Sequence, residues 1–127
     1  MDYNTSIFAF YFKESGGLAP VNNYVLFDSL SKELVHVNLE NKSVTKKLLQ
    51  DVEGQTKNLR DAILIAEFFD LKPVYNAGGP DMIRFLLTVT DMGAPSPSKS
   101  KTVSWYDGSE VHGVLNNVVT EIKKLLD

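Results

Sequence analysis

Short hydrophobic blocks separated by polar turns fill the first third of the chain and predict a run of β-strands. In the block Ile7-Phe8-Ala9-Phe10-Tyr11-Phe12 every position is apolar or aromatic, so we expect a strand that is buried on both faces, or nearly so. Residues 23–28 and 33–39 predict the second and third strands. Residues 43–49 fit either a fourth strand or a short helix, and the pattern leaves both open.

The middle of the chain has the three-to-four-residue spacing of an amphipathic helix. This helix is expected to begin near Thr56, whose hydroxyl suits an N-cap, and Ile65 and Phe69 widen its apolar stripe. Pro73 should end it, because a proline disfavours helical geometry in the residue before it. The stripe itself consists of Leu59, Ala62, Ile63 and Ala66.

A second helix is predicted at the C-terminal end of the chain. Asp107 and Glu110 stand three residues apart, as in a capping box, and should mark its start. Between the two helices, residues 82–90 and 101–106 predict a pair of strands. Their connection over residues 91–100 is rich in serine and proline, so we expect it to be exposed and mobile. The second helix has a broad apolar face formed by Val111, Val114, Leu115, Val118, Val119, Ile122, Leu125 and Leu126.

These elements predict a single α+β domain over residues 1–127. Strands joined by short turns pair antiparallel, and two helices with one apolar face each must cover one side of the sheet. We therefore expect an antiparallel sheet of four to five strands with two helices packed on one face, in the order strands, helix, two strands, helix. A chain of 127 residues is long enough to bury a core without a disulfide or a metal.

Composition narrows the classes of function more than it narrows the fold. Thirteen basic and 16 acidic residues give a net charge of −3, whereas a nucleic-acid binder usually carries a basic patch, so we expect no nucleic-acid partner. The chain has no cysteine, no charged-then-apolar leader and no apolar run near the ~20 residues that span a bilayer. We therefore expect a cytoplasmic protein without a membrane partner.

Residues that carry catalysis or bind metals are scarce in this sequence. His36 and His112 are far apart, and no H-E-x-x-H pattern is present, so neither predicts a metal site. Ser15-Gly16-Gly17 lacks the Gly-x-Ser-x-Gly pattern of a nucleophile elbow, and Gly78-Gly79-Pro80 lacks the longer glycine pattern of a phosphate-binding loop. We expect no catalytic residue, no metal and no cofactor, and a chain that is not an enzyme.

The order of several short motifs nevertheless points to one family. An aromatic strand leads into Ser15-Gly16-Gly17-Leu18-Ala19, a helix runs into Ala66-Glu67-Phe68-Phe69-Asp70-Leu71, and Pro80-Asp81 precedes a strand. From about Phe8 to Leu126, this order resembles the emfourin-like proteins, which are small cytoplasmic inhibitors of thermolysin-type metalloproteases. The chain departs from the family pattern at Pro20, where a glycine is typical, and in a longer connection around residues 92–100.

The resemblance implies a non-enzymatic protein that binds a metalloprotease by inserting a loop. The implied partner-binding residues are Gly16, Gly17, Leu18, Ala19 and Pro20. Leu18 would be the apolar anchor, because thermolysin-type enzymes favour an apolar residue in their main specificity pocket. The sequence leaves open whether Leu18 is exposed in this way or packs against the final helix. It also leaves open an interaction or regulatory module with another partner, and a small-ligand carrier that uses a gap between sheet and helices.

Overall fold

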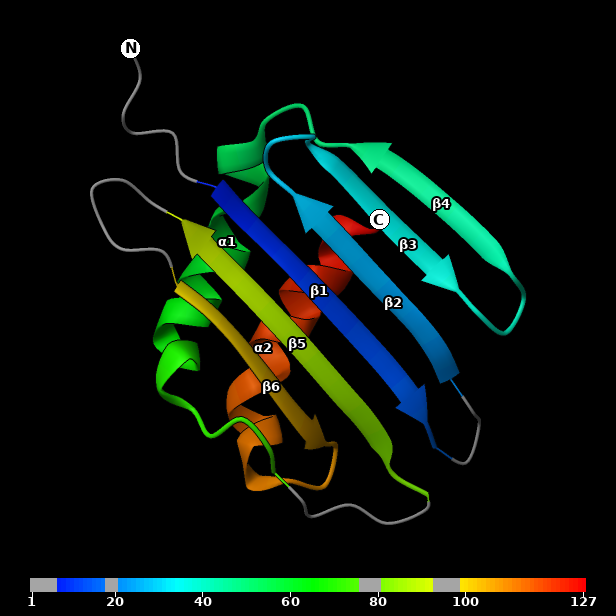
Figure 1. Cartoon of the computed structure of the whole chain (residues 1–127), viewed down its shortest axis with the longest axis vertical. Coiled ribbons are helices and arrows are strands. Elements are labelled where there is room, and N and C mark those ends of the chain that lie inside the picture. Colours follow the sequence, from blue (N-terminus) through cyan, green and yellow to red (C-terminus); the bar gives the residue numbers. More distant parts are fainter. Residues whose placement is uncertain (1–6, 18–20, 76–80, 93–98) are drawn as a thin grey trace.

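One antiparallel sheet of six strands forms the frame of the protein, in the order β4-β3-β2-β1-β5-β6 (Figure 1). The computed structural model describes residues 7–17, 21–75, 81–92 and 99–127. The strands are β1 (Ile7–Gly16), β2 (Val21–Asp28), β3 (Glu33–Asn38), β4 (Ser43–Leu48), β5 (Ile83–Met92) and β6 (Lys99–Tyr106). The helical elements are α1 (Val52–Ile65), the short 3-10 helix η1 (Phe68–Asp70) and α2 (Glu110–Leu125).

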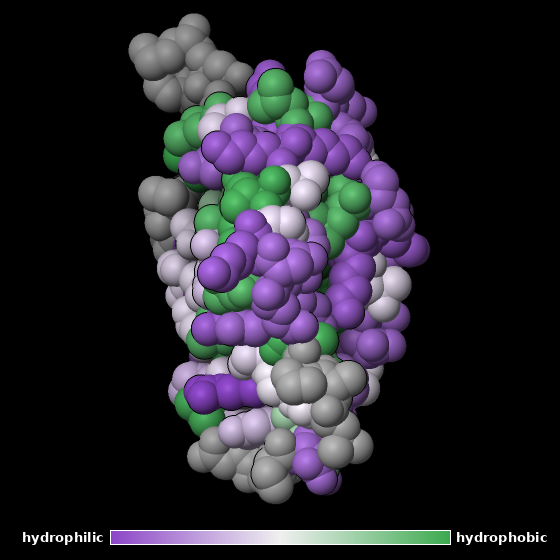
Figure 2. Space-filling view, turned by 90° about the vertical axis from the view of Figure 1, so that its right-hand side faces the viewer, coloured by the Kyte–Doolittle hydropathy of each residue, from purple (hydrophilic) through white to green (hydrophobic). Residues whose placement is uncertain are grey.

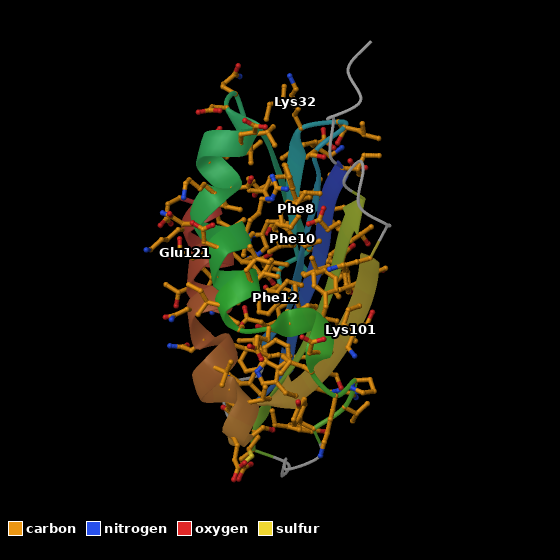
Figure 3. The ribbon with its side chains drawn as sticks, turned by 90° about the vertical axis from the view of Figure 1, so that its left-hand side faces the viewer. Phe8, Phe10, Phe12, Lys32, Lys101 and Glu121 are labelled. Carbon is orange, nitrogen blue, oxygen red and sulfur yellow. The ribbon has the colours of Figure 1, made fainter. Side chains whose placement is uncertain are left out.

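The α+β class and the placement of both helices on one face of the sheet are confirmed (Figures 1 and 3). The expected number of four to five strands was too low, because residues 43–48 form a strand that pairs with β3 along its whole length. This also settles the choice between strand and helix for that segment. The predicted hairpin β5–β6 is longer than expected, since residues 91, 92, 99 and 100 belong to its strands. The rest of that connection, residues 93–98, lies outside the described residues.

Strand β1 is buried on one face only, which corrects the expectation of burial on both faces. Ala9 and Tyr11 lie on the other face and are half-buried. The sequence pattern was misleading because the face of β1 that carries no helix, called the open face below, is also apolar. The spacing of apolar residues alone therefore could not tell the two faces of the strand apart. The helix-facing side chains, each at most 3% exposed, are Phe8, Phe10 and Phe12 (Figure 3).

Helix α1 begins four residues before the predicted start at Thr56. Asp51 is the N-cap, and its carboxylate accepts the Gly54 N–H at 3.1 Å. Thr56 is fully buried, and its hydroxyl donates to the Val52 carbonyl at 2.6 Å, so it belongs to the helix interior. A threonine can satisfy its hydroxyl in this way without capping, which the sequence pattern does not distinguish.

Pro73 does not end α1, which also differs from the prediction. The helix ends at Ile65, and Glu67 takes a left-handed φ of 52° before η1 begins. Ile65 does not widen the apolar stripe, because its side chain is 82% exposed, whereas Phe69 does pack against the core. The left-handed backbone at Glu67 changes the direction of the chain before the proline is reached. Pro73 lies further along the chain, in the segment that approaches β6.

Helix α2 begins at Glu110 of the predicted pair, but its N-cap is Ser109 rather than Asp107. The Ser109 hydroxyl accepts the Tyr106 N–H at 3.1 Å, so it closes the turn that leads from β6 into the helix. Val114, predicted on the apolar face, is 50% exposed, because that face is centred further round the helix. The buried positions of this helix are Val111, Leu115, Val118, Val119, Ile122 and Leu125.

The two edges of the sheet differ in their protection. At the β6 edge, Val74 forms a parallel bridge with Ser104, and the Tyr75 N–H donates to the Ser104 carbonyl at 2.9 Å. Strand β4 forms the opposite edge, where Lys46 and Lys47 alternate across the strand. In the view from that side, hydrophilic side chains surround smaller hydrophobic areas (Figure 2). Lysine on an edge strand discourages pairing with a second sheet.

Candidate functional site

The first candidate site is the end of the β1–β2 hairpin, where the sequence places its implied partner-binding residues. Strand β1 pairs with β2 up to Gly16–Val21 and with β5 up to Gly16–Ile83. Gly16 is therefore held by strands on both sides at the point where the hairpin begins to turn.

Backbone geometry explains why glycines stand at this point. Gly16 and Gly17 have φ values of 91° and 98°, which side chains on an L-residue rarely allow. A Cβ on Gly16 would also lie 3.2 Å from the Met82 carbonyl oxygen, which is a tight contact. Arg84 is exposed opposite Ser15, so a cation lies beside the hairpin end on the open face of the sheet.

The structure brings only part of the predicted site into view. Gly16 and Gly17 are described and lie together at the end of β1. Leu18, Ala19 and Pro20 lie outside the described residues, so the question of whether Leu18 is an exposed anchor or a core residue stays open.

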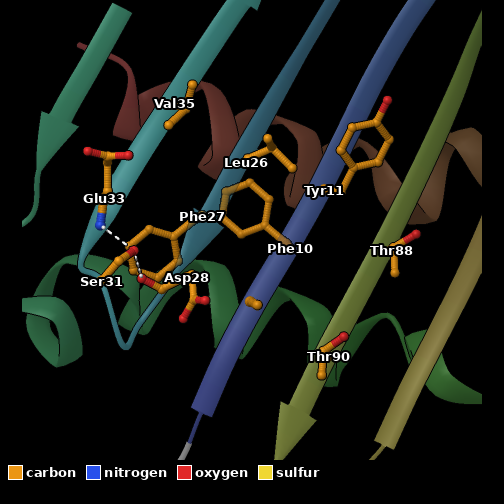
Figure 4. A pocket seen from close by; sticks show the side chains of 11 residues that line it. Phe10, Tyr11, Leu26, Phe27, Asp28, Ser31, Glu33, Val35, Thr88 and Thr90 are labelled. Carbon is orange, nitrogen blue, oxygen red and sulfur yellow. Dashed lines mark hydrogen bonds between the residues drawn. The ribbon is translucent and has the colours of Figure 1, made fainter.

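The second candidate site is a groove on the face of the sheet that carries no helix, and sequence reasoning missed it. The groove has a volume of about 420 Å³. Its floor is at Ala9, because the small side chain leaves a depression between Tyr11, Leu26 and the threonines of β5 (Figure 4). The signal was present in the alternation of β1, β2 and β3, where both sets of alternate positions carry apolar residues.

One side of this groove is acidic. Asp28 and Glu33 pair across β2 and β3, and both line the groove (Figure 4). The Asp28 Oδ1 accepts the Leu30 N–H at 2.8 Å, which fixes the turn between the two strands. The site therefore combines an apolar floor with carboxylates at its margin, an arrangement that suits a chain with an aliphatic stem and a cationic end.

On the open face of the sheet, Tyr11 is a titratable residue whose surroundings change its pKa. Burial raises the pKa of the Tyr11 hydroxyl above its ordinary value, and the neighbouring Tyr24 raises it further. The two rings are tilted against each other with centroids 5.6 Å apart. Tyr11 is therefore neutral at physiological pH and offers its hydroxyl group beside the ring of Tyr24.

On the covered face, polar groups hold the helices in place. The Glu14 carboxylate is 3.1 Å from the Lys123 ammonium, which joins β1 to α2. The Trp105 indole N–H donates to His112 Nδ1 at 3.2 Å, and His112 stacks on Phe85. These side chains pack the helices against the sheet rather than lining a common cavity. Within residues 7–17, 21–75, 81–92 and 99–127, no three histidine or acidic side chains gather closely enough to hold a metal ion.

Neither α1 nor α2, nor any other helix in the described part of the chain, is long and apolar enough to cross a membrane. Comparison with protein-family models and with curated proteins finds no match to this chain.

Proposed function

We propose that this protein is a non-enzymatic, protein-binding module that inhibits a thermolysin-type metalloprotease through the loop of its β1–β2 hairpin. The observation that carries the proposal is the pair of positive-φ glycines at the end of a strand that is paired on both sides. This geometry supports the resemblance at Ser15-Gly16-Gly17-Leu18-Ala19, because the backbone that leads into the loop is fixed by the sheet and loses little conformational entropy on binding. A sequence without cysteine is the basis for proposing the cytoplasm as its compartment.

The mechanism follows from the chemistry of the loop. Gly16 and Gly17 let the backbone turn away from the sheet without a side chain in the way. Leu18 supplies the apolar group for the specificity pocket of the protease, and Pro20 limits the conformations of the loop before β2 resumes. Inhibition of this kind requires no chemical group on the inhibitor, only occupation of the cleft.

The test compares inhibition constants for two leucine variants. Leu18→Asp should weaken inhibition of a thermolysin-type protease on the order of a hundredfold or more, since a charge in an apolar pocket is costly. Leu30→Asp is the matched control, because Leu30 is 64% exposed in the turn after β2 and lies at the other end of that strand. Circular dichroism and the free energy of unfolding should be unchanged in both variants. Equal inhibition by Leu18→Asp and the original chain would contradict the proposed anchor.

The rival functions have different signatures. An interaction module with another partner would leave the protease fully active, and the same assay detects this. For a small-ligand carrier, the structure would need a sizeable opening between sheet and helices. In the described residues, the openings beside Arg60 and beside Leu126 measure about 80 and 140 Å³. A typical ligand site has roughly 300 Å³ or more, so these two openings do not favour a ligand held between sheet and helices.

A further inference from the structure

The open face of the sheet carries an apolar surface that the hairpin proposal does not use. In the first row across the strands, Tyr11 pairs with Leu26 and Leu26 with Val35. In the next row, Tyr24 pairs with Val37 and Val37 with Val44. Residues directly opposite on neighbouring strands point to the same face, so the six side chains form one surface. We use the name outer apolar patch for these six residues, which are Tyr11, Tyr24, Leu26, Val35, Val37 and Val44.

Charges of opposite sign stand at two different levels of this face along the strands. Ala9 and Lys13 lie two residues to either side of Tyr11 on β1, so all three face the same way. At the level of Ala9, the neighbouring strands carry Asp28 and Glu33. At the level of Lys13, they carry the apolar Tyr24 and Val37 of the patch. The face is therefore acidic on the side of the groove and basic on the side of Lys13.

We propose that this face is the interface of a homodimer, with a second copy of the chain as its occupant. A two-fold axis that lies in the interface and crosses the strands at the level of Tyr11 maps the level of Ala9 onto the level of Lys13. Each Lys13 then lies over the depression at Ala9 of the other copy, with its alkyl stem on the apolar floor. Its ammonium reaches the acidic side of that groove, beside Asp28.

Self-complementarity is the reason for choosing a second copy over another partner. A two-fold interface uses the same surface twice, so it needs a cationic projection and an acidic recess on one face at equal distances from the axis. This face has both, and the row Tyr11, Leu26 and Val35 of the outer apolar patch lies between their levels. A partner with a single charge sign would satisfy one side of the face and leave the other without a counter-charge.

Packing of faces also fits this sheet better than pairing of edges. The β6 edge is covered by residues 73–75, and the β4 edge carries Lys46 and Lys47. The patch extends about 15 Å across four strands at a spacing of about 4.8 Å, and its two rows are about 7 Å apart along the strands. This is small beside specific interfaces of about 800 Å² per partner, so we expect a dissociation constant in the micromolar range.

Sedimentation velocity over a concentration series tests the dimer, and charge reversal tests its geometry. The original chain should show a monomer–dimer equilibrium. Lys13→Glu and Asp28→Lys should each weaken the dimer on the order of tenfold or more, because each places two like-charged pairs in a two-fold interface. An equimolar mixture of the two variants should restore association as a heterodimer, in which both pairs again carry opposite charges. Native mass spectrometry with one variant isotope-labelled distinguishes the heterodimer from either homodimer.

Controls separate the interface from general effects on charge and folding. Lys72→Glu and Glu40→Lys reverse exposed charges away from the groove, so neither should change association. Because Asp28 also accepts the Leu30 N–H, Glu33→Lys serves as a second acidic-side variant that leaves this turn bond in place. A chain that is monomeric at concentrations on the order of 100 µM would overturn the proposal. So would a dimer that is insensitive to these reversals, or a mixture that associates no better than its components.

Discussion

The two faces of the central strand β1 show how one segment serves two purposes. Phe10 and Phe12 point into the core and are almost completely buried, whereas Ala9 and Tyr11 between and beside them lie on a face that no helix covers. Both sets of side chains are apolar, so hydrophobicity alone does not account for the difference. Helices α1 and α2 each carry one apolar stripe, and both stripes are used on the same side.

The comparison indicates which parts of the chain hold the fold together and which are available for recognition. On the covered face, aromatic stacking continues from Phe12 through Phe85 to Trp105, and the Trp105 indole N–H is paired with His112. On the open face, apolar residues surround a shallow groove with carboxylates at one side. We therefore expect substitutions on the first face to change stability and those on the second to change association.

The largest expected effect comes from truncating neighbouring aromatic residues on opposite faces. Phe12→Ala should lower the free energy of unfolding by about 3–5 kcal/mol, because it leaves a cavity in the core. Tyr11→Ala should cost about 1 kcal/mol in the monomer, since the ring is half-buried and has solvent on one side. Urea unfolding at low protein concentration measures both. Equal losses would show that the open face contributes to the core as much as the covered face does.

The next effect concerns the hairpin end. Gly16→Ala should lower the free energy of unfolding by about 1–3 kcal/mol, because an L-residue at a φ of 91° is strained and its Cβ meets the Met82 carbonyl. Gly113→Ala is the opposite control, since nothing lies within 4 Å of a Cβ at this position in α2. It should raise the free energy of unfolding by about 0.5–1 kcal/mol. Thermal and urea unfolding of the pair would contradict the account if both substitutions changed stability in the same direction.

A smaller effect should distinguish the lysines of the two faces. Lys123→Ala removes the partner of the mostly buried Glu14 carboxylate and should cost about 1 kcal/mol, a modest value because Lys123 itself is half-exposed. Lys13→Ala should change monomer stability by no more than about 0.5 kcal/mol. Measurements at low and high salt provide the check, because only the loss from Lys123→Ala should shrink as salt screens the Glu14–Lys123 pair.

The smallest effect is on tyrosine ionisation. Burial, and to a lesser extent Tyr24, raises the pKa of Tyr11 above the value of a free tyrosine. The protonated form is thus favoured in the folded state, so this contribution to stability is complete below the unfolded pKa near 10 and is lost as pH rises through the folded value. Ultraviolet titration, with Tyr11→Phe to assign the signal, should show ionisation at higher pH than in a tyrosine peptide. Tyr24→Phe should reverse only the smaller part of the shift.

Sequence patterns predicted the elements better than they predicted which sides of them are buried. The stripe of α1 located that helix, because its pattern has one period and one buried side. The start of α1 was misplaced since Thr56 suits a cap by residue type but is buried in the helix. The open face was missed because β1 is apolar at every position from 7 to 12, and only pairing with the helices shows which half is covered. At the hairpin, Gly16 and Gly17 are residues suited to a turn, and both have positive φ values.

The most direct test of the central claim is a titration of a thermolysin-type metalloprotease with this protein, following hydrolysis of a small peptide substrate. The account predicts a linear loss of activity that ends at one chain per protease, with the chain left intact. Full protease activity at micromolar excess of the chain, or cleavage of the chain as a substrate, would contradict it.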